Sequence, residues 1–241
     1  MAKVSASASR SYIDEFALSG YLSTVSIGVE QETPVVTTFG DAGPRRLVGN
    51  YDVSCELGGF FDAATGGLDP VTFVSLFDAD EHYVTVTLGA NGAGTVGCRD
   101  MLLSLSGLPQ VAANGAGITI NHSWVGRGGM VRSTILGDKT STAAENLSGV
   151  NMGVTSSGTT FAVIYRVLAF SGSNITFTMQ GSSDNGSGDT YAAISGLAET
   201  FTAVGVARDT ITAATEAWKR VAITGTFSSA TVLVSAGSVA A

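Results

Sequence analysis

Short runs in which apolar and polar residues alternate recur along the whole chain, and they limit its fold more than any other feature. The run at 51–57 is the clearest: Tyr51, Val53, Cys55 and Leu57 alternate with Asp52, Ser54 and Glu56. A period of two places successive side chains on opposite faces of a β-strand, so such a run predicts a strand with one buried face. Gly, Asn and Pro residues separate the runs and predict turns between the strands.

A helix is predicted at one place, after Phe61. Asp69 is a suitable N-cap residue, and Pro70 suits the first helical position. The apolar residues that follow supply an apolar stripe for this helix: Val71, Phe73, Val74, Leu76 and Phe77.

The segment 148–160 contains small and polar residues without a hydrophobic pattern, which predicts a domain boundary near residue 150. Residues 1–150 hold 8 Lys/Arg and 15 Asp/Glu, a net charge of −7, whereas residues 151–241 hold 4 and 5, a net charge of −1. The predicted fold is mainly all-β. An antiparallel sandwich or barrel with one short flanking helix spans 1–150, and a second, small β-sandwich spans 151–241. The Asn185-Gly186 pair is a strong hairpin signal within the second domain.

The net charge of the whole chain is −8, which disfavours a protein that grips nucleic acid, because such affinity comes mainly from neutralising phosphates. An acidic surface suits DNA that must slide past without sticking. Charged residues make up only 13% of the chain, about half the usual share. This low charge suits a subunit packed against copies of itself, and a secreted β protein with a polar surface is the simpler alternative.

Motifs for catalysis and cofactor binding are missing from the sequence. It has neither a GxSxG nucleophile turn nor a glycine-rich nucleotide loop, and its two histidines, His82 and His122, are not closely spaced. Cys55 and Cys98 lie in apolar runs and are interpreted as small buried hydrophobes, although a disulfide between them stays open. We therefore expect no enzymatic activity, no cofactor and no metal. The N-terminal residues lack the apolar stretch of a signal peptide, and no apolar run approaches 18 residues, so we expect synthesis in a cytoplasm and no membrane anchor.

Residues 40–50 concentrate two arginines in an otherwise acidic half of the chain. One interpretation is an interaction loop, formed by Asp41, Pro44, Arg45 and Arg46, which meets acidic faces of neighbouring subunits through Arg–carboxylate pairs. The alternative is an ordinary polar loop between two strands.

Three runs of sequence resemble structural proteins of long-tailed bacteriophages: Y-I-D-E-F-x-L-S-G-Y-L at 12–22, Q-E-T-P-x-V-T-x-F-G-D-A-G-P-R-R at 31–46, and G-x-F-D-A-A-x-G-x-L-D at 59–69. The chain looks most like a major tail (tail tube) protein, and the resemblance covers about residues 10–135. The second domain looks like the extra β-sandwich that some of these proteins carry on the outside of the tube.

The resemblance implies a virion protein, made in the host cytoplasm, that self-assembles into hexameric rings. Strands of each subunit would join one inner barrel, and stacked rings would form a tube with an acidic lumen through which DNA passes. The first candidates for the lumen are Glu30, Glu32, Asp52 and Glu56, and the loop around Arg45 and Arg46 would form the contact between rings. The implied partners are copies of the chain, other tail proteins (terminator, tape measure, distal tail) and DNA that is not bound specifically.

Two other functions stay open at the level of sequence. A capsid decoration or other head protein would share the composition without needing an acidic lumen. A glycan- or receptor-binding tail component would use residues 151–241 as its binding module, with Tyr191 and Trp218 lining the site.

Overall fold

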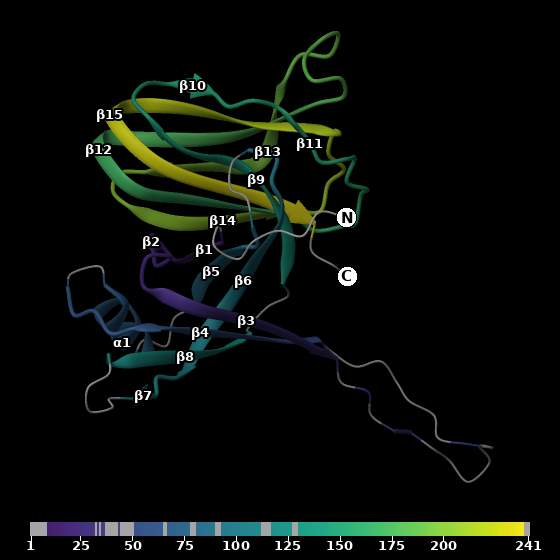
Figure 1. Ribbon diagram of the computed structural model, residues 1–241. Coiled ribbons are helices and arrows are strands. Elements are labelled where there is room, and N and C mark those ends of the chain that lie inside the picture. Colours follow the sequence, from purple (N-terminus) through teal and green to yellow (C-terminus); the bar gives the residue numbers. More distant parts are fainter. Residues whose placement is uncertain are drawn as a thin grey trace. The chain divides into compact units, whose positions relative to one another are not determined.

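The computed structural model describes residues 9–31, 33, 35–36, 43, 51–64, 67–77, 81–89, 93–111, 117–126 and 130–238 (Figure 1). In this part of the chain there are fifteen strands, which pair antiparallel, and one helix, so the all-β prediction is confirmed. The chain divides into two compact units that interleave in sequence. Unit 1 comprises 1–20, 83–100 and 130–241, and unit 2 comprises 21–82 and 101–129.

Unit 1 contains most of the strands. They are β1 (Arg10–Ile13), β2 (Phe16–Ala17), β5 (His82–Thr87), the first part of β6 (Val96–Gly107), β9 (Val131–Ser141), β10 (Glu145–Asn146), β11 (Val150–Asn151), β12 (Phe161–Ser182), β13 (Ala192–Phe201), β14 (Gly205–Ile211) and β15 (Trp218–Ser238). The boundary predicted at residue 150 lies inside this unit and stays a prediction. Strand β15 pairs with β9 on one side of that boundary and with β12 on the other.

The two longest strands, β12 and β15, pair along their whole length and curve round together (Figure 1). The first half of β12 also pairs with β14, and its second half pairs with β13. Tyr165 and Phe177 lie twelve positions apart on β12, yet their rings stack with centroids 5.6 Å apart. A straight strand would separate them by about 40 Å. The strand therefore folds back over itself and closes a core between its own two halves.

Glycines and bulges make this bend sterically feasible. The pairing of β12 with β15 shifts register three times between Val167 and Asn174. Gly225 has a φ of +126°, and a Cβ there would lie 2.5 Å from the carbonyl oxygen of Asn174. A Cβ at Gly172 would lie 2.5 Å from Cα of Phe227. Close approach of two backbones requires glycine at these positions.

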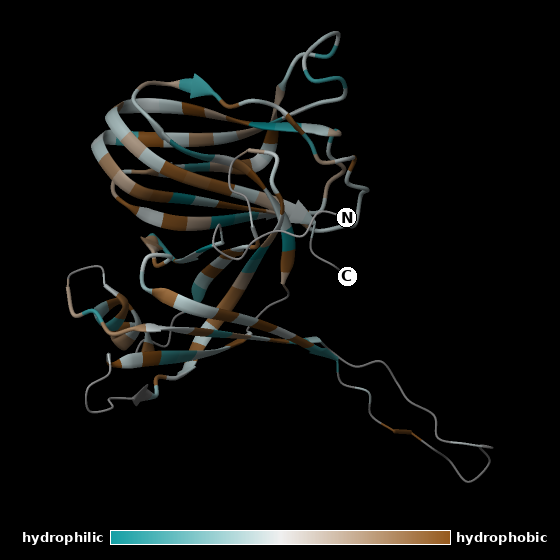
Figure 2. Ribbon diagram, in the orientation of Figure 1, coloured by the Kyte–Doolittle hydropathy of each residue, from teal (hydrophilic) through white to brown (hydrophobic). Residues whose placement is uncertain are grey.

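Apolar side chains from both halves of the bent pair form the main core of unit 1, and they alternate with polar ones along the strands (Figure 2). The buried residues of this core are Leu136, Leu147, Phe161, Val163, Tyr165, Val167, Ile175, Phe177, Met179, Leu197, Val221, Ile223, Ala230, Val232, Val234 and Ala236.

The other face of β12 carries Arg166, which is fully buried. Its Nε donates to the carbonyl oxygen of Asp14 at 2.7 Å, and one Nη donates to that of Tyr83 at 2.8 Å. Burial lowers the pKa of Arg166, and the Asp100 carboxylate opposes that shift. Asp100 accepts hydrogen bonds from Thr85 and from Ser235, which fixes its position in the same interior. These contacts tie the N-terminal strands of unit 1 to β12.

Unit 2 is a small sheet with one helix. Its elements are β3 (Leu22–Gln31), β4 (Tyr51–Phe60), α1 (Leu68–Phe77), β7 (Gln110–Val111), β8 (Thr119–Gly126) and the last part of β6. The strand order is β3–β4–β8–β6, and β7 also pairs with β8. Val53, Cys55 and Leu57 are buried on one face, as the alternation predicts, whereas Tyr51 at the start of β4 is 58% exposed.

The apolar stripe of the helix is only partly buried. Leu68, Thr72 and Ser75 form the buried face of α1, and Phe73 and Val74 are 49% and 64% exposed. The hydroxyls of Thr72 and Ser75 donate to the carbonyl oxygens of Leu68 and Val71, four residues earlier, so both can be buried without an outside partner. Apolar composition alone did not show which side of the helix the sheet covers.

Cys55 and Cys98 are both buried free thiols, so no disulfide joins them. Burial raises the pKa of each thiol to about 12. No helix within the described residues has the length and apolar character needed to cross a membrane.

Candidate functional site

One face of the unit 2 sheet is polar, and we call it the acidic face. Alternate residues of three neighbouring strands form it: Thr24, Ser26, Gly28 and Glu30 of β3, Asp52, Ser54, Glu56 and Gly58 of β4, and Asn121, Ser123 and Val125 of β8. The strands place these residues side by side because their pairing is in register. The apolar residues between them, such as Cys55 and Trp124, point to the opposite face and are buried.

Three predicted lumen residues lie on this acidic face. Glu30, Asp52 and Glu56 are all exposed, and Glu30 pairs directly with Asp52 across β3 and β4. Like charges directly opposite one another destabilise a sheet. The described part of unit 2 contains no Lys or Arg that could offset this repulsion. Counted over its whole sequence, unit 2 has three Lys/Arg and ten Asp/Glu, a net charge of −7.

Apart from these carboxylates, the acidic face carries short side chains. A hollow of about 430 Å³ opens beside Gly58 and is lined in part by Thr24, Glu56 and Asn121. A Cβ at Gly58 would lie 2.4 Å from Oγ1 of Thr24 and 2.8 Å from Oδ1 of Asn121. The sheet thus presents small hydroxyl and amide groups together with a few negative charges.

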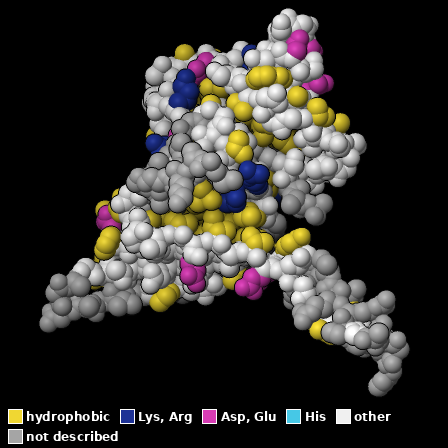
Figure 3. All heavy atoms as spheres, turned by 45° about the vertical axis from the view of Figure 1, so that its right-hand side comes forward, with side chains coloured by type: hydrophobic (Ala, Val, Ile, Leu, Met, Phe, Trp, Pro, Cys, Tyr) yellow, Lys and Arg dark blue, Asp and Glu magenta, His cyan; other side chains and the backbone are white. Residues whose placement is uncertain are grey.

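Strand β3 forms the edge of this sheet. Within the described residues it pairs with β4 alone. It is ten residues long and contains neither Pro nor Lys, the residues that often protect an edge. On its apolar side Val25 and Ile27 are only half-buried, and Val29 is 46% exposed. Exposed hydrophobic side chains are visible at several places in Figure 3.

The aromatic residues predicted for a binding surface lie on one face of unit 1. Trp218 and Arg220 occupy alternate positions of β15, and the Arg220 guanidinium carbon lies 4.1 Å from the centroid of the Tyr191 ring. Both aromatic side chains are half-buried. Sequence reasoning did not single out Arg220, although its place two residues after Trp218 on a strand was a usable signal.

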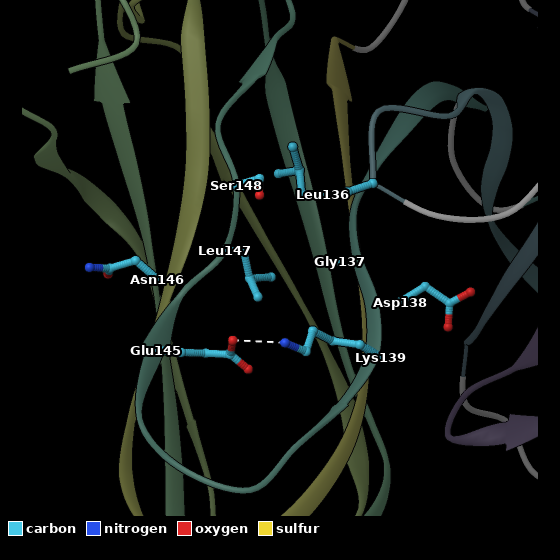
Figure 4. A pocket seen from close by; sticks show the side chains of 9 residues that line it. Leu136, Gly137, Asp138, Lys139, Glu145, Asn146, Leu147 and Ser148 are labelled. Carbon is cyan, nitrogen blue, oxygen red and sulfur yellow. Dashed lines mark hydrogen bonds and ion pairs between the residues drawn. The ribbon is translucent and has the colours of Figure 1, made fainter. Parts of the chain in front are cut away.

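Unit 1 also has a small hollow of about 170 Å³ between β9 and β10 (Figure 4). Lys139 and Glu145 form an ion pair there at 2.7 Å, and Leu147 lies beside it. The hydrogen bond from Lys139 is the main cause that lowers the pKa of Glu145. The pair joins β9 and β10.

The residues predicted for the inter-ring loop are not among those that the structure describes. Asp41, Pro44, Arg45 and Arg46, together with the lumen candidate Glu32, lie outside the described residues. Among the residues that the structure describes, no group of three or more His, Cys, Asp or Glu side chains could hold a metal ion.

No known family model matches the chain, and no curated protein matches it. Several solved structures are similar. A protein of the virion of the native gene transfer agent particle is 18% identical, covering 46% of this chain and 82% of that one, with a TM-score of 0.37. The Dit protein of phage SPP1, described as a hub adsorption apparatus, is 10% identical over 96% of this chain and 99% of its own, with a TM-score of 0.36. The SPP1 tail tube protein is 8% identical over 52% and 77%, with a TM-score of 0.41. These three neighbours are, in order, a virion protein, a hub protein and a tail tube protein.

Proposed function

We propose that this chain is a structural protein of a phage tail, whose copies form stacked, hexameric rings around a channel for DNA. In this assembly the acidic face of unit 2 lines the lumen. The two domains and the ring-to-ring role of Arg45 and Arg46 remain part of the same proposal. The chain acts by packing against its copies and against other tail proteins, without catalysis.

The single observation that carries the proposal is the acidic face. Placing Glu30 directly opposite Asp52 lowers the stability of the sheet. Within the described residues, this face has no basic side chain that would offset the repulsion. Such an arrangement is useful where a polyanion must pass nearby without binding. Phosphates and carboxylates repel one another, so DNA keeps its counterions and gains nothing from contact.

The edge of the sheet supports the self-assembly part of the proposal. An unprotected ten-residue edge is an aggregation hazard in a monomer. Joining β3 to a strand of the next copy would pair its backbone groups and cover the half-exposed apolar side of Val25, Ile27 and Val29. A closed ring of subunits removes every such edge.

The first experiment is negative-stain electron microscopy of the purified full chain across a concentration series. The proposal expects rings with a central channel, or tubes built from them. Monomers that stay separate at every concentration would contradict it, and compact trimers would favour a head protein.

The second experiment tests the lumen. The double variant Asp52→Lys, Glu56→Lys keeps Glu30, which can then pair with the new Lys at 52, so we expect its fold to be retained. Its tubes should bind DNA in a salt-dependent way, whereas wild-type tubes should not. Glu216→Lys, on an exposed residue of unit 1, is the control and should behave as wild type. Equal DNA binding by the control and the double variant would contradict a lumen lined by the acidic face.

A further inference from the structure

The start of β15 presents a tryptophan and an arginine on the same outer face of unit 1. Trp218 and Arg220 are two positions apart, and Lys219 between them points inward. The Lys219 ammonium group donates to the carbonyl oxygens of Gly153 and Glu216 and is fully buried. Alternation along a strand thus leaves the indole and the guanidinium side by side and half-exposed.

Two contacts fix the Arg220 guanidinium. Its Nε donates to Gln180 Oε1 at 2.7 Å, and the Tyr191 ring covers one of its planar faces. Tyr191 is held in turn, because its hydroxyl donates to Asn185 Oδ1 at 2.7 Å. A Cβ at Gly149 would lie 1.9 Å from the Tyr191 oxygen, so only glycine allows the ring to lie there.

This arrangement leaves one edge of the guanidinium available. With Nε bonded and a face covered, the two terminal Nη groups form the open edge. They have no hydrogen-bond partner within the described residues. Two parallel N–H groups match the two oxygens of a carboxylate and bind it bidentately. Because the side chain is already held, little conformational entropy is lost when an anion binds.

The surroundings favour a sugar as the carrier of that carboxylate. Trp218 offers a half-exposed indole on one side of Arg220, which suits stacking against the apolar face of a sugar ring. Asn151, paired with Trp218 across β11 and β15, and Asn185 supply exposed amide groups for hydroxyls. A few aimed polar groups beside an aromatic surface are typical of small-molecule sites.

Asp184, whose charge also acts on Tyr191, is engaged by its own loop. The Asp184 carboxylate accepts backbone N–H groups of Ser187, Gly188 and Asp189, which hold its pKa below the usual range. The compact turn around Asn185 is therefore held by hydrogen bonds within the chain.

We propose that Arg220, flanked by Tyr191 and Trp218, binds an acidic saccharide through the carboxylate of its uronic or sialic acid unit. The site lies within unit 1 alone and does not depend on the assembly proposed above. It would let the chain attach to acidic glycans.

The test titrates the full-length chain with D-glucuronate and N-acetylneuraminate while tryptophan fluorescence and two-dimensional NMR spectra are recorded. D-Glucose is the neutral probe and acetate the bare carboxylate. At least one acidic sugar should give a saturable change with a Kd on the order of 1 mM, as a single small site allows. Glucose and acetate should bind at least ten-fold more weakly.

Variants assign the effect to the arginine. Arg220→Gln should abolish the saturable change, and Arg220→Lys should weaken it at least ten-fold, because a lysine retains the charge without the planar fork. Arg132→Gln, at an exposed arginine of β9, is the matched control and should bind as wild type. Should Arg220→Gln fail to fold, Arg220→Lys decides alone. The proposal would be overturned if neither acidic sugar gave saturation. It would also be overturned if acetate bound equally well, or if Arg220→Lys bound as the wild type does.

Discussion

At the scale of single residues, the sequence predicted exposed acids better than buried charges. Glu30, Asp52 and Glu56 lie on the exposed face that alternation assigned to them. Arg166 and Lys219 are fully buried. Each follows an apolar residue in a run that predicts a strand but not the burial of the charged side chain. Whether a long cationic side chain points into a core depends on carbonyl oxygens that tertiary folding brings near, and a single sequence does not contain that information.

His122 is a buried histidine whose titration should affect the stability of unit 2. It lies on β8, has no exposed surface, and pairs with Leu57 of β4. Burial lowers its pKa from 6.5 to about 4. The folded state therefore favours the neutral imidazole, while the unfolded chain takes up a proton near pH 6.5. The stability associated with this residue should be full above pH 6.5 and fall as the pH drops towards 4.

The variant His122→Leu removes this titration and places an apolar side chain of similar size among Leu57, Ile120 and Trp124. Between pH 6.5 and 4, the free energy of unfolding of the wild type should fall by up to about 3 kcal/mol more than that of the variant. Urea denaturation of both proteins at intervals of pH measures the difference. His82, next to Trp124, is unchanged in both proteins. Parallel pH curves would mean that His122 is not the group responsible.

At the scale of elements, alternation in the sequence predicted that strands form, but it did not predict how they curve. The sequence of β12 contains two separate candidate strands, at 161–170 and 173–182. In the structure they form one bent strand whose bulges keep it paired with β15. The helix shows the complementary limit, since composition indicated α1 but its buried side is set by the sheet beside it. Local pattern specifies an element, whereas its curvature and orientation depend on partners distant in sequence.

The bend gives a prediction about Gly225. Its φ of +126° and the 2.5 Å approach of a Cβ to the Asn174 carbonyl oxygen combine strain with a steric clash. Gly225→Ala should lower the free energy of unfolding by about 3 kcal/mol. Gly153→Ala separates the two effects, because Gly153 also has a positive φ of +76° but open space around it. That control should cost only about 1 kcal/mol. Chemical denaturation measures the free energy of unfolding of both variants. An equal decrease in the two would show that the clash at the bend is relieved without a loss of stability.

At the scale of the whole molecule, charge is distributed unevenly between the two units. Unit 2 has a net charge of −7, and unit 1, with nine Lys/Arg and ten Asp/Glu, has −1. The sequence-based division at residue 150 gave the same two values, and that division stays a prediction. The two compact units interleave in sequence, because β6 passes from one to the other and 130–241 joins 1–20 and 83–100. Only long-range strand pairing reveals such an arrangement, and alternation does not encode it.

This asymmetry makes assembly sensitive to salt if copies of unit 2 gather around a common lumen. Their acidic faces repel one another over about 30 Å at 0.01 M salt but over only about 8 Å at 0.15 M. The concentration needed for rings or tubes, followed by light scattering and electron microscopy, should therefore fall as sodium chloride is raised across that range. The triple variant Glu30→Gln, Asp52→Asn, Glu56→Gln should assemble at low salt and respond less to added salt, whereas Glu216→Gln should keep the wild-type response. Assembly that weakens with salt in the wild type would instead indicate that copies meet through opposite charges, and the acidic face would then belong to a contact between subunits and not to a channel.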